Sequence, residues 1–369
     1  MKILLATLEY VPFRGGVAVY LEQMVQQLKR EHEVFVVADR YKNSFMHDQE
    51  VSYPLIRHDF YFNFGIFRWL RSYFFLRKLH RQEKFDHLII SHILPMGYVA
   101  LLLGIPFTII FHGTDVRNAM ENPIRSFFFR MILKKAMFVI SNSHYTQTLI
   151  ERCPISSKHN IIVYPSPKDF TITSYSDYSQ GVTKLLSVNR LVPRKGNDKV
   201  LEAMYVMSQN GFSNFTYTIV GSGPYKEQLI NMINRYRLSD RVVIMENVPD
   251  DALSQLYSTH HLFVMPGRLE NNVDVEGFGI VYLEAALHKM PSIASHVGGA
   301  AEAVLQGETG ILINATDEHD LVDALIYAQK NPEIIKKFGE QAYERTTTNF
   351  TPTQQWKHYL ELLSQDEKI

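Results

Sequence analysis

The stretch Asp274-Val-Glu-Gly-Phe-Gly-Ile-Val-Tyr-Leu-Glu284 carries two glutamates eight positions apart and follows the apolar run His261-Leu-Phe-Val-Met-Pro266. The apolar run predicts a buried strand and a loop, and the residues after Glu276 have helical spacing. Glu276 is therefore expected at a helix N-terminus, beside the backbone amides of residues 277–280. Glu284 would lie about 12 Å further along the helix axis, at roughly 1.5 Å per residue. Two carboxylates at that spacing suit a ligand with hydroxyl groups at both ends.

Apolar runs alternate with amphipathic segments on both sides of this stretch, which predicts an α/β fold with parallel, doubly wound sheets. The first half contains predicted helices at 17–30, 69–82 and 124–134. Its predicted strands are 2–7, 33–38, 87–91, 107–111, 138–141 and 161–164. The second half has predicted strands at 184–188, 216–220, 242–245, 262–265, 292–294 and 310–313.

The chain of 369 residues is long enough for two domains, each with its own core. Residues 165–182 lack periodicity and are expected to link them. The boundaries expected are a first domain at 1–165, a linker at 166–182, a second domain at 183–350 and a last helical segment at 351–369. Ligands of such sheets bind beyond the carboxyl ends of the strands, so the functional residues are sought there.

Composition narrows the class of protein further. With 46% hydrophobic residues the chain is globular, and its single cysteine, Cys153, excludes an internal disulfide and fits a reducing compartment. Residues 1–165 carry 20 Lys and Arg against 13 Asp and Glu, and the remainder carries 18 against 25. The basic first half favours an acidic or membrane-bound partner. The uncharged stretch 93–111 contains two prolines and two glycines, which favours a helix, a turn and a strand over a membrane span.

The Glu-x7-Glu segment resembles the signature of retaining glycosyltransferases of family 4, which have two Rossmann-like domains facing a central cleft, the GT-B architecture. Segments such as Arg190-Leu-Val-Pro-Arg-Lys-Gly196 are most similar to the mannosyltransferases that build phosphatidylinositol mannosides. The resemblance implies α-glycosyl transfer with retained configuration, without metal or cofactor. The donor it implies is a nucleotide-diphosphate sugar, with GDP-mannose favoured and a UDP-sugar as the alternative. It also implies that the last helix crosses back onto the first domain.

Arg190 and Lys195 follow the first strand of the second half. Sugar transfer expels a diphosphate whose negative charge grows as the glycosidic bond breaks, and two cations at a strand end stabilise that charge. The pair resembles the family's Arg-x4-Lys clamp. By the same resemblance, His112 in His112-Gly-Thr-Asp115 and Glu276 contact the transferred sugar. The residues expected to bind the donor are Gly15, Gly16, Gly221, Gly223, Val248, Gly277, Phe278, Gly279, Ile280 and Glu284.

A stretch rich in aromatic and basic residues, 60–81, favours docking to an anionic membrane, which fits a lipid-linked acceptor. The alternatives are core aromatics with solvated cations, and a nucleic-acid partner, which is disfavoured by the aromatic density. The cations expected at the lipid surface are Arg68, Arg71, Arg77, Lys78 and Arg81.

The protein is accordingly expected in the cytoplasm, peripheral on the inner face of the membrane, acting on a lipid-linked or glycan acceptor. A soluble acceptor such as a sugar phosphate, and a nucleotide-sugar-binding protein without transfer activity, remain the alternatives. The oligomeric state is left open by the sequence.

Overall fold

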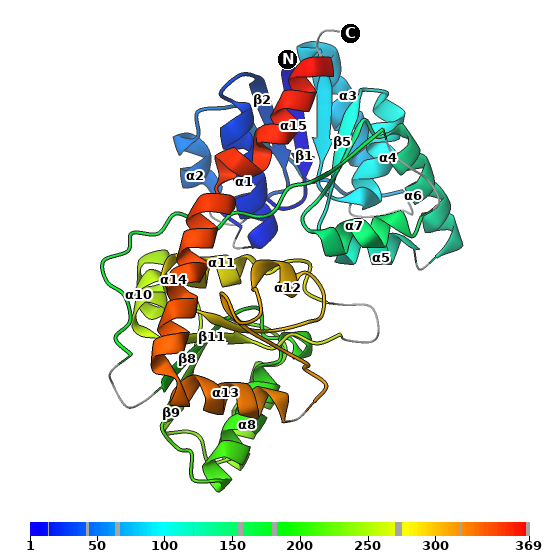
Figure 1. Ribbon diagram of the computed structural model, residues 1–369. Helices are drawn as coiled ribbons and strands as arrows, with labels where there is room; N and C mark the ends of the chain where they lie inside the picture. The colour runs from blue at the N-terminus through cyan, green and yellow to red at the C-terminus, as the bar shows by residue number, and fades with distance from the viewer. Residues whose placement is uncertain are drawn as a thin grey trace. The chain divides into compact units, whose positions relative to one another are not determined.

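The computed structural model describes residues 1–13, 15–41, 44–62, 67–120, 122–153, 158–178, 183–269, 275–317 and 319–366. The chain divides into two compact units (Figure 1). Unit 1 comprises Met1–Ser166 together with Pro352–Ile369, and unit 2 comprises Pro167–Thr351.

Unit 1 is built on a seven-stranded parallel sheet with the strand order β3-β2-β1-β4-β5-β6-β7. Successive residues of β1 point to opposite faces, so Leu4 and Ala6 join one core layer while Ile3 and Leu5 join the other. Its strands are β1 (Lys2–Thr7), β2 (Glu33–Ala38), β3 (Leu55–Arg57), β4 (His87–Ile90), β5 (Phe107–Phe111), β6 (Phe138–Ser141) and β7 (His159–Ile162).

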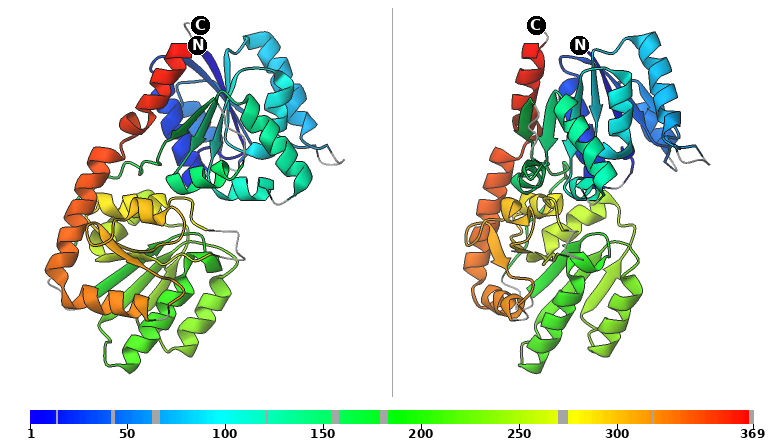
Figure 2. Two further views of the ribbon diagram at one scale, coloured as in Figure 1. Left: turned by 45° about the vertical axis from the view of Figure 1, so that its right-hand side comes forward. Right: turned by 90° about the vertical axis from the view of Figure 1, so that its right-hand side faces the viewer.

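Helices cover both faces of this sheet (Figure 2). Residues of α3, α4 and α6 pack on one face, and residues of α1 and α15 on the other. The helices of unit 1 are α1 (Gly16–Leu28), α2 (Ser44–Glu50), α3 (Leu70–Glu83), α4 (Ile93–Leu103), α5 (Thr114–Met120), α6 (Pro123–Lys135), α7 (His144–Glu151) and α15 (Pro352–Asp366). The predicted helix, turn and strand at 93–111 are confirmed as α4 and β5.

Helix α15 completes the core of unit 1 from far along the chain. Trp356, Tyr359 and Leu363 recur at helical spacing and are at most 1% exposed. The Tyr359 hydroxyl lies 2.9 Å from Thr108 Oγ1 on β5, so the buried phenol is hydrogen-bonded. Burial of three large side chains on one face explains why this helix belongs to unit 1.

Unit 2 is built on a six-stranded parallel sheet with the order β10-β9-β8-β11-β12-β13. Both sheets are thus parallel and wound in both directions from a central strand, as the sequence predicts. The strands are β8 (Thr183–Val188), β9 (Phe215–Val220), β10 (Val242–Met245), β11 (Leu262–Met265), β12 (Ser292–Ser295) and β13 (Gly310–Ile313).

The helices of unit 2 form two layers, with α8, α9 and α13 in the core of one face and α10 and α11 against the other (Figure 1). The helices are η1 (Pro193–Lys195), α8 (Asn197–Gln209), α9 (Lys226–Arg235), α10 (Asp250–Thr259), α11 (Ile280–Leu287), α12 (Ala300–Ala303), α13 (Asp320–Lys330) and α14 (Pro332–Asn349).

The expected linker, residues 166–182, is described as far as residue 178; Ser166 belongs to unit 1, and the linker is attached to unit 2 from Pro167 onward. The Ser176 hydroxyl donates to the carbonyl of Ser258 at 3.1 Å, and the Tyr178 hydroxyl donates to that of His261 at 3.2 Å. The Phe170 ring lies 5.9 Å from that of Tyr257. The segment has no regular secondary structure, but these contacts make it a strap on unit 2 rather than a free connection.

Candidate active site

The loop between β11 and α11 carries Glu276, and its course corrects one expectation. Helix α11 begins only at Ile280, because Gly279 adopts a φ of +91° that interrupts the helical path. Glu276 therefore precedes the helix by four residues instead of standing at its N-terminus. The expected separation of 12 Å along one axis is also wrong, since only residues 280–284 of that interval are helical. Asp274 lies outside the described residues.

Glu276 is held by two cations from the short helix η1. Arg194 Nη1 lies 3.2 Å from Glu276 Oε2, and Lys195 Nζ donates to the same oxygen. Burial alone would raise the pKa of Glu276, but the charges of Lys195 and Arg194 outweigh it and hold this pKa below its ordinary value. Two cations and one carboxylate leave a net positive site at the ends of the loops after β8 and β11.

Glycines allow these loops to approach one another. A Cβ on Gly196 would lie 2.2 Å from the carbonyl oxygen of Pro266, and one on Gly299 would lie 2.0 Å from that of Gly277. The Gly299 amide also donates to the Glu276 carbonyl at 2.9 Å. Only residues without a side chain fit at these two positions, so the position of the Glu276 backbone is fixed by its neighbours.

An ion pair that the sequence analysis did not identify supports the same loops. Arg268 Nη1 lies 2.9 Å and 2.8 Å from the two carboxylate oxygens of Asp198, which is 5% exposed. The backbone amide of Arg268 donates to the Arg194 carbonyl at 2.8 Å. Arg268 therefore joins the loop after β11 to the first turn of α8 and to η1. No local motif marks this pair, because its members are 70 residues apart.

Arg190 lies on the same loop as the cation cluster but has an exposed side chain. The structure thus brings Lys195 to Glu276 and adds Arg194, which the sequence analysis missed although it adjoins Lys195 in Pro193-Arg-Lys-Gly196. Arg190 is not part of the cluster with Glu276. Its backbone is set by the strand end and by the next loop.

Gly221 and Gly223 form that next loop, after β9. A Cβ on Gly221 would lie 1.8 Å from the Asn189 carbonyl oxygen, and one on Gly223 would lie 2.3 Å from that of Leu191. The Leu191 amide donates to the Ser222 carbonyl at 2.9 Å. The two glycines therefore let the loop lie directly against the residues on either side of Arg190.

Glu284 is buried within α11, where it is 5% exposed. The Tyr257 hydroxyl donates to Glu284 Oε2 at 3.0 Å. Burial raises the pKa of Glu284, and the nearby Lys168 charge and the Tyr257 hydrogen bond only partly oppose that. Glu284 is thus a largely buried carboxylate whose Oε2 is bonded to Tyr257.

The other predicted donor residues of unit 2 are mainly backbone positions. Phe278 is 1% exposed and its ring lies 5.9 Å from that of Phe350, so its side chain belongs to the core. Ile280 opens α11, while Gly277 and Gly279 belong to the loop before it. Val248 is 9% exposed and follows Asn247, whose φ of +54° turns the chain after β10.

In unit 1, Gly15 and Gly16 begin α1 as expected. Gly15 is the N-cap residue in an extended conformation, and Gly16 is the first helical residue. A Cβ on Gly15 would lie 2.9 Å from the Phe13 ring. The start of α1 follows the carboxyl end of β1, at the edge where parallel sheets bind ligands.

His112 lies at the same edge, directly after β5. Asp115 accepts hydrogen bonds from the amides of His112 at 3.1 Å and Gly113 at 2.9 Å, so the turn is closed by its own carboxylate. Burial lowers the pKa of His112 to about 3 and raises the pKa of Asp115 to about 6. His112 Nε2 is buried and has no hydrogen-bond partner among the described residues.

His92, which the sequence analysis missed, follows β4 at this edge. Its Nδ1 lies 2.9 Å from Ser91 Oγ, and its Nε2 lies 4.0 Å from Glu9 Oε1. Burial lowers the pKa of His92 to about 4, and that of Glu9 is raised. Three titratable side chains therefore follow the adjacent strands β1, β4 and β5. A histidine directly after a strand was the available signal.

The aromatic and basic stretch divides between core and surface. Most of its aromatic side chains pack in or against the core, while Phe74 is 57% exposed on α3. Arg71 lies 3.2 Å from Asp59 and is committed to an ion pair, and Arg68 Nε donates to the Phe62 carbonyl at 2.6 Å. Arg77, Lys78 and Arg81 are exposed on α3 together with Phe74. Residues 63–66 of this stretch lie outside the described residues.

Two kinds of feature are absent from the described residues. They contain no group of three or more His, Cys, Asp or Glu side chains placed to hold a metal ion. Within them, helices long and apolar enough to cross a membrane are also absent.

Comparison with known proteins identifies the class of enzyme. Residues 14–166 match the family described as Glycosyltransferase Family 4, and residues 177–345 match Glycosyl transferases group 1. The chain belongs to the GT-B glycosyltransferases. It is accordingly an enzyme that moves a sugar from a nucleotide sugar to an acceptor.

Relatives include the GDP-mannose-dependent alpha-(1-6)-phosphatidylinositol monomannoside mannosyltransferase of Mycolicibacterium smegmatis. It is 30% identical over 354 residues, covering 88% of this chain and 87% of the relative.

Solved structures confirm the fold. Sucrose-phosphate synthase from Thermosynechococcus elongatus has a TM-score of 0.80 at 20% identity, covering 98% of this chain and 99% of its own. The Anabaena protein Alr3699/HepE, solved in complex with UDP and glucose, has a TM-score of 0.81 at 18% identity, covering 99% and 100%.

Proposed function

We propose that the protein transfers a hexose, with mannose from GDP-mannose favoured, to a lipid-linked or glycan acceptor at a membrane surface, with retention of configuration and without a metal. The observation that carries this proposal is the group formed by Lys195, Arg194 and Glu276. The relative from Mycolicibacterium smegmatis, named as GDP-mannose-dependent, supports the choice of donor.

The cations are assigned to the leaving diphosphate. In the proposed reaction the bond between the sugar C1 and the diphosphate oxygen breaks, and the acceptor oxygen bonds to C1 on the same face. The leaving phosphate takes the acceptor's proton. Lys195 and Arg190 stabilise the charge that grows on the phosphate, with Arg194, which shares Glu276 with Lys195, as a third cation. Glu276 accepts hydrogen bonds from sugar hydroxyls.

His112 is assigned to the transferred sugar. Its low pKa keeps the imidazole neutral at physiological pH, so it offers a hydrogen bond rather than a charge. The buried Nε2, which lacks a partner among the described residues, supports this role because buried polar atoms are normally hydrogen-bonded. Glu284 and the backbone near Val248 are assigned to the nucleoside, and the amides at the start of α1 to the diphosphate.

The membrane surface is proposed for the acceptor because cations and an exposed aromatic residue share one face of α3. Arg77, Lys78 and Arg81 supply the charge and Phe74 an apolar side chain. Anionic lipid headgroups attract such a face. This assignment is narrower than the five cations expected from the sequence, because Arg68 and Arg71 interact within unit 1.

Removal of the diphosphate contacts tests the proposal. Arg190→Ala and Lys195→Ala should each lower kcat by a factor of several hundred, because one lost charge contact in the transition state costs roughly 3–4 kcal/mol. Lys199→Ala is the matched control, since Lys199 pairs with Glu202 at 2.7 Å on α8 and should keep its rate. Near-native turnover by both Arg190→Ala and Lys195→Ala would contradict the assignment of these cations to the diphosphate.

The donor is tested separately by thermal shift. GDP should raise the melting temperature more than UDP or ADP at equal concentration, because a ligand that binds only the native state stabilises it according to its affinity. A larger shift with UDP would change the proposed donor while leaving the transferase assignment intact.

A further inference from the structure

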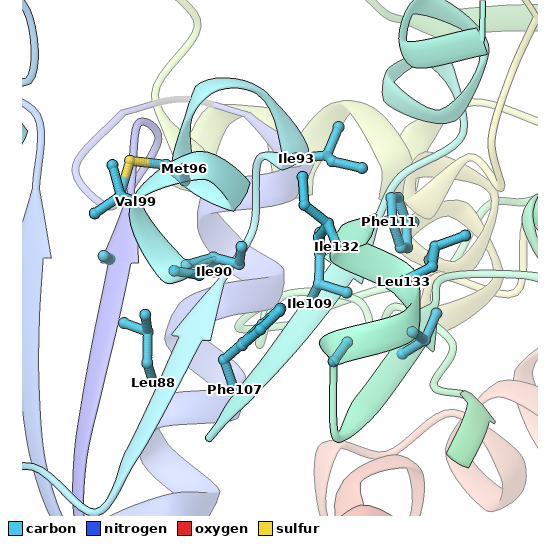
Figure 3. Packing of buried hydrophobic residues seen from close by; sticks show 14 of the residues in the cluster. Leu88, Ile90, Ile93, Met96, Val99, Phe107, Ile109, Phe111, Ile132 and Leu133 are labelled. Carbon is cyan, nitrogen blue, oxygen red and sulfur yellow. The ribbon is translucent and has the colours of Figure 1, made fainter. Parts of the chain in front are cut away.

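Helix α4 is apolar on every side. Its eleven residues, Ile93–Leu103, include no charged side chain. Figure 3 shows its inner face, where Met96 and Val99 pack in the same buried cluster as Ile90 of β4. A helix that is hydrophobic all round is normally buried on all sides. The outer face of α4 is only partly covered, and Leu102 is 53% exposed.

Helix α6 lies beside α4 and also has apolar side chains on both its inner and its outer face. Its inner residues Ile132 and Leu133 are buried in the core (Figure 3). Its outer face carries Phe128, whose ring lies 5.0 Å from that of Tyr98 on α4, and Met131, which is 39% exposed. The inner faces of α4 and α6 are buried in the core, whereas apolar side chains on their outer faces remain exposed.

These outer faces form the walls of a groove of about 1140 Å³. That volume exceeds the roughly 300–1,000 Å³ typical of small-molecule sites. The lining includes Leu101 and Leu102 of α4, the following loop 104–106, and Phe107, the first residue of β5. The groove therefore reaches the amino end of the sheet, whereas His112 and the start of α1 lie at the carboxyl end.

The charged side chains in the described lining of the groove are all cations. Among the residues that the structure describes, the lining contains Lys134, Lys135 and Lys158 and no Asp or Glu. Lys134 and Lys135 end α6, where the helix dipole also favours cations. Lys158 belongs to the segment just before β7. An apolar groove bordered by three lysines is complementary to an anionic amphiphile.

We propose that this groove binds one chain of an anionic phospholipid, with the lipid phosphate at Lys134, Lys135 and Lys158. This goes beyond the proposed transfer, because the groove lies at the opposite end of the sheet from the predicted sugar site. It also differs from docking through α3, since surface attraction by Arg77, Lys78 and Arg81 requires no space for a hydrocarbon chain.

The test measures binding of lysophosphatidylglycerol to the full chain by isothermal titration calorimetry. The donor is left out, and the lipid is kept below its micelle concentration. Wild type should bind one lipid. Met131→Glu puts a carboxylate on the groove wall and should weaken binding at least on the order of tenfold. Phe127→Glu is the matched control, because Phe127 is 59% exposed on the same helix but does not line the groove. Leu102→Asp repeats the test from α4 if Met131→Glu fails to fold.

Two ligand controls separate chain from headgroup. Glycerol phosphate alone should not bind measurably, and lysophosphatidylcholine should bind more weakly than the anionic lipid. The double variant Lys134→Gln, Lys135→Gln should lose roughly 25-fold in affinity for the anionic lipid, fivefold for each cation.

Several results would overturn the inference. They are equal lipid binding by wild type, Met131→Glu and Leu102→Asp, saturable binding of glycerol phosphate alone, and a wild-type dimer in sedimentation that Met131→Glu dissociates. The last result would assign the groove to a second copy of the chain. None of these outcomes depends on donor turnover, so a failed lipid test leaves the proposed transferase function standing.

Discussion

At the residue scale, Lys195 contacts the carboxylate of Glu276, although Lys195 is also proposed to bind the diphosphate. The carboxylate and the diphosphate therefore compete for the same ammonium group. Glu276→Gln should therefore bind a nucleoside diphosphate more tightly than wild type, by about fivefold if the pair is worth roughly 1 kcal/mol. The same variant should lose turnover, because the sugar hydroxyls lose the carboxylate proposed to accept their hydrogen bonds.

Calorimetric titration and product assays measure the two effects on one preparation. Glu202→Gln, which removes the partner of Lys199, is the control and should change neither. The pKa of Glu276 is depressed, so its competition for Lys195 should persist at neutral pH and fade as pH falls through that lowered value. Unchanged or weaker diphosphate binding by Glu276→Gln would contradict the assignment.

The lowered pKa of His112 gives a second prediction at this scale. The unfolded chain takes up a proton near the ordinary value of 6.5, whereas folded His112 does so only near 3. The free energy of unfolding should therefore fall as pH drops below about 6.5, by up to about 1.4 kcal/mol per pH unit. His112→Gln should show a shallower loss between pH 7 and 5 in urea titrations.

The comparison with His112→Gln is needed because Asp115 acts in the opposite direction. Its pKa is raised to about 6, so the folded state gains stability relative to the unfolded state as Asp115 takes up its proton. Parallel pH profiles for wild type and His112→Gln would mean that His112 titrates normally.

Individual residues were predictable where a local pattern carried them. Lys195 and Glu276 belong to segments with recognisable spacing, and both lie in the group that the structure reveals. Arg268 and Asp198 form a pair between distant loops, which no local pattern shows. Arg194 and His92 adjoined predicted features, but their roles depend on distances that only the folded chain defines.

At the element scale, the loop after β9 should tolerate no side chain at its two glycines, Gly221 and Gly223. Gly223→Ala places a methyl group against the Leu191 carbonyl, so the free energy of unfolding should fall by more than about 2 kcal/mol and donor affinity should fall with it. Gly307→Ala is the control, because Gly307 also has a positive φ but has open space around it. The free energy of unfolding of Gly307→Ala should be lower than that of wild type by about 1 kcal/mol. Equal melting temperatures for the two variants would contradict the packing argument.

The exposed face of α3 gives another prediction for an element. The protein should sediment with anionic liposomes, remain free of neutral ones, and be released as salt screens the attraction. The triple variant Arg77→Gln, Lys78→Gln, Arg81→Gln should lose this binding.

The matching control is Lys336→Gln with Lys337→Gln, because both lysines are exposed on α14 of the other unit. Equal binding to anionic and neutral liposomes would mean that Arg77, Lys78 and Arg81 contact only solvent. That result would favour a soluble acceptor.

Most strands were predictable because parallel strands buried on both faces have continuous apolar sequences. The strand β3 was missed because Leu55–Arg57 is a three-residue edge strand with too little sequence to show a pattern. The start of α11 was placed too early because residues 276–279 share the apolar spacing of the helix, while the positive φ of Gly279 ends helical geometry there.

At the scale of the whole molecule, turnover should not require a divalent cation. In the proposed reaction, Lys195, Arg194 and Arg190 supply the positive charge that stabilises the departing diphosphate, so EDTA should leave kcat unchanged. Product formation measured with EDTA and after addition of Mg²⁺ tests this directly. If EDTA abolishes turnover and Mg²⁺ or Mn²⁺ restores it, the phosphate site is wrongly assigned.

The assignment of α15 to unit 1 bears on how the protein is made. Trp356, Tyr359 and Leu363 emerge from the ribosome only after all of unit 2, residues 167–351, has been synthesised. At ~5–20 residues per second, the sheet of unit 1 waits roughly 10–40 seconds for its last covering helix. During that interval the apolar surface that α15 later covers is open to chaperones and to other nascent chains. Synthesis of the second unit therefore sets the time at which the first becomes safe from aggregation.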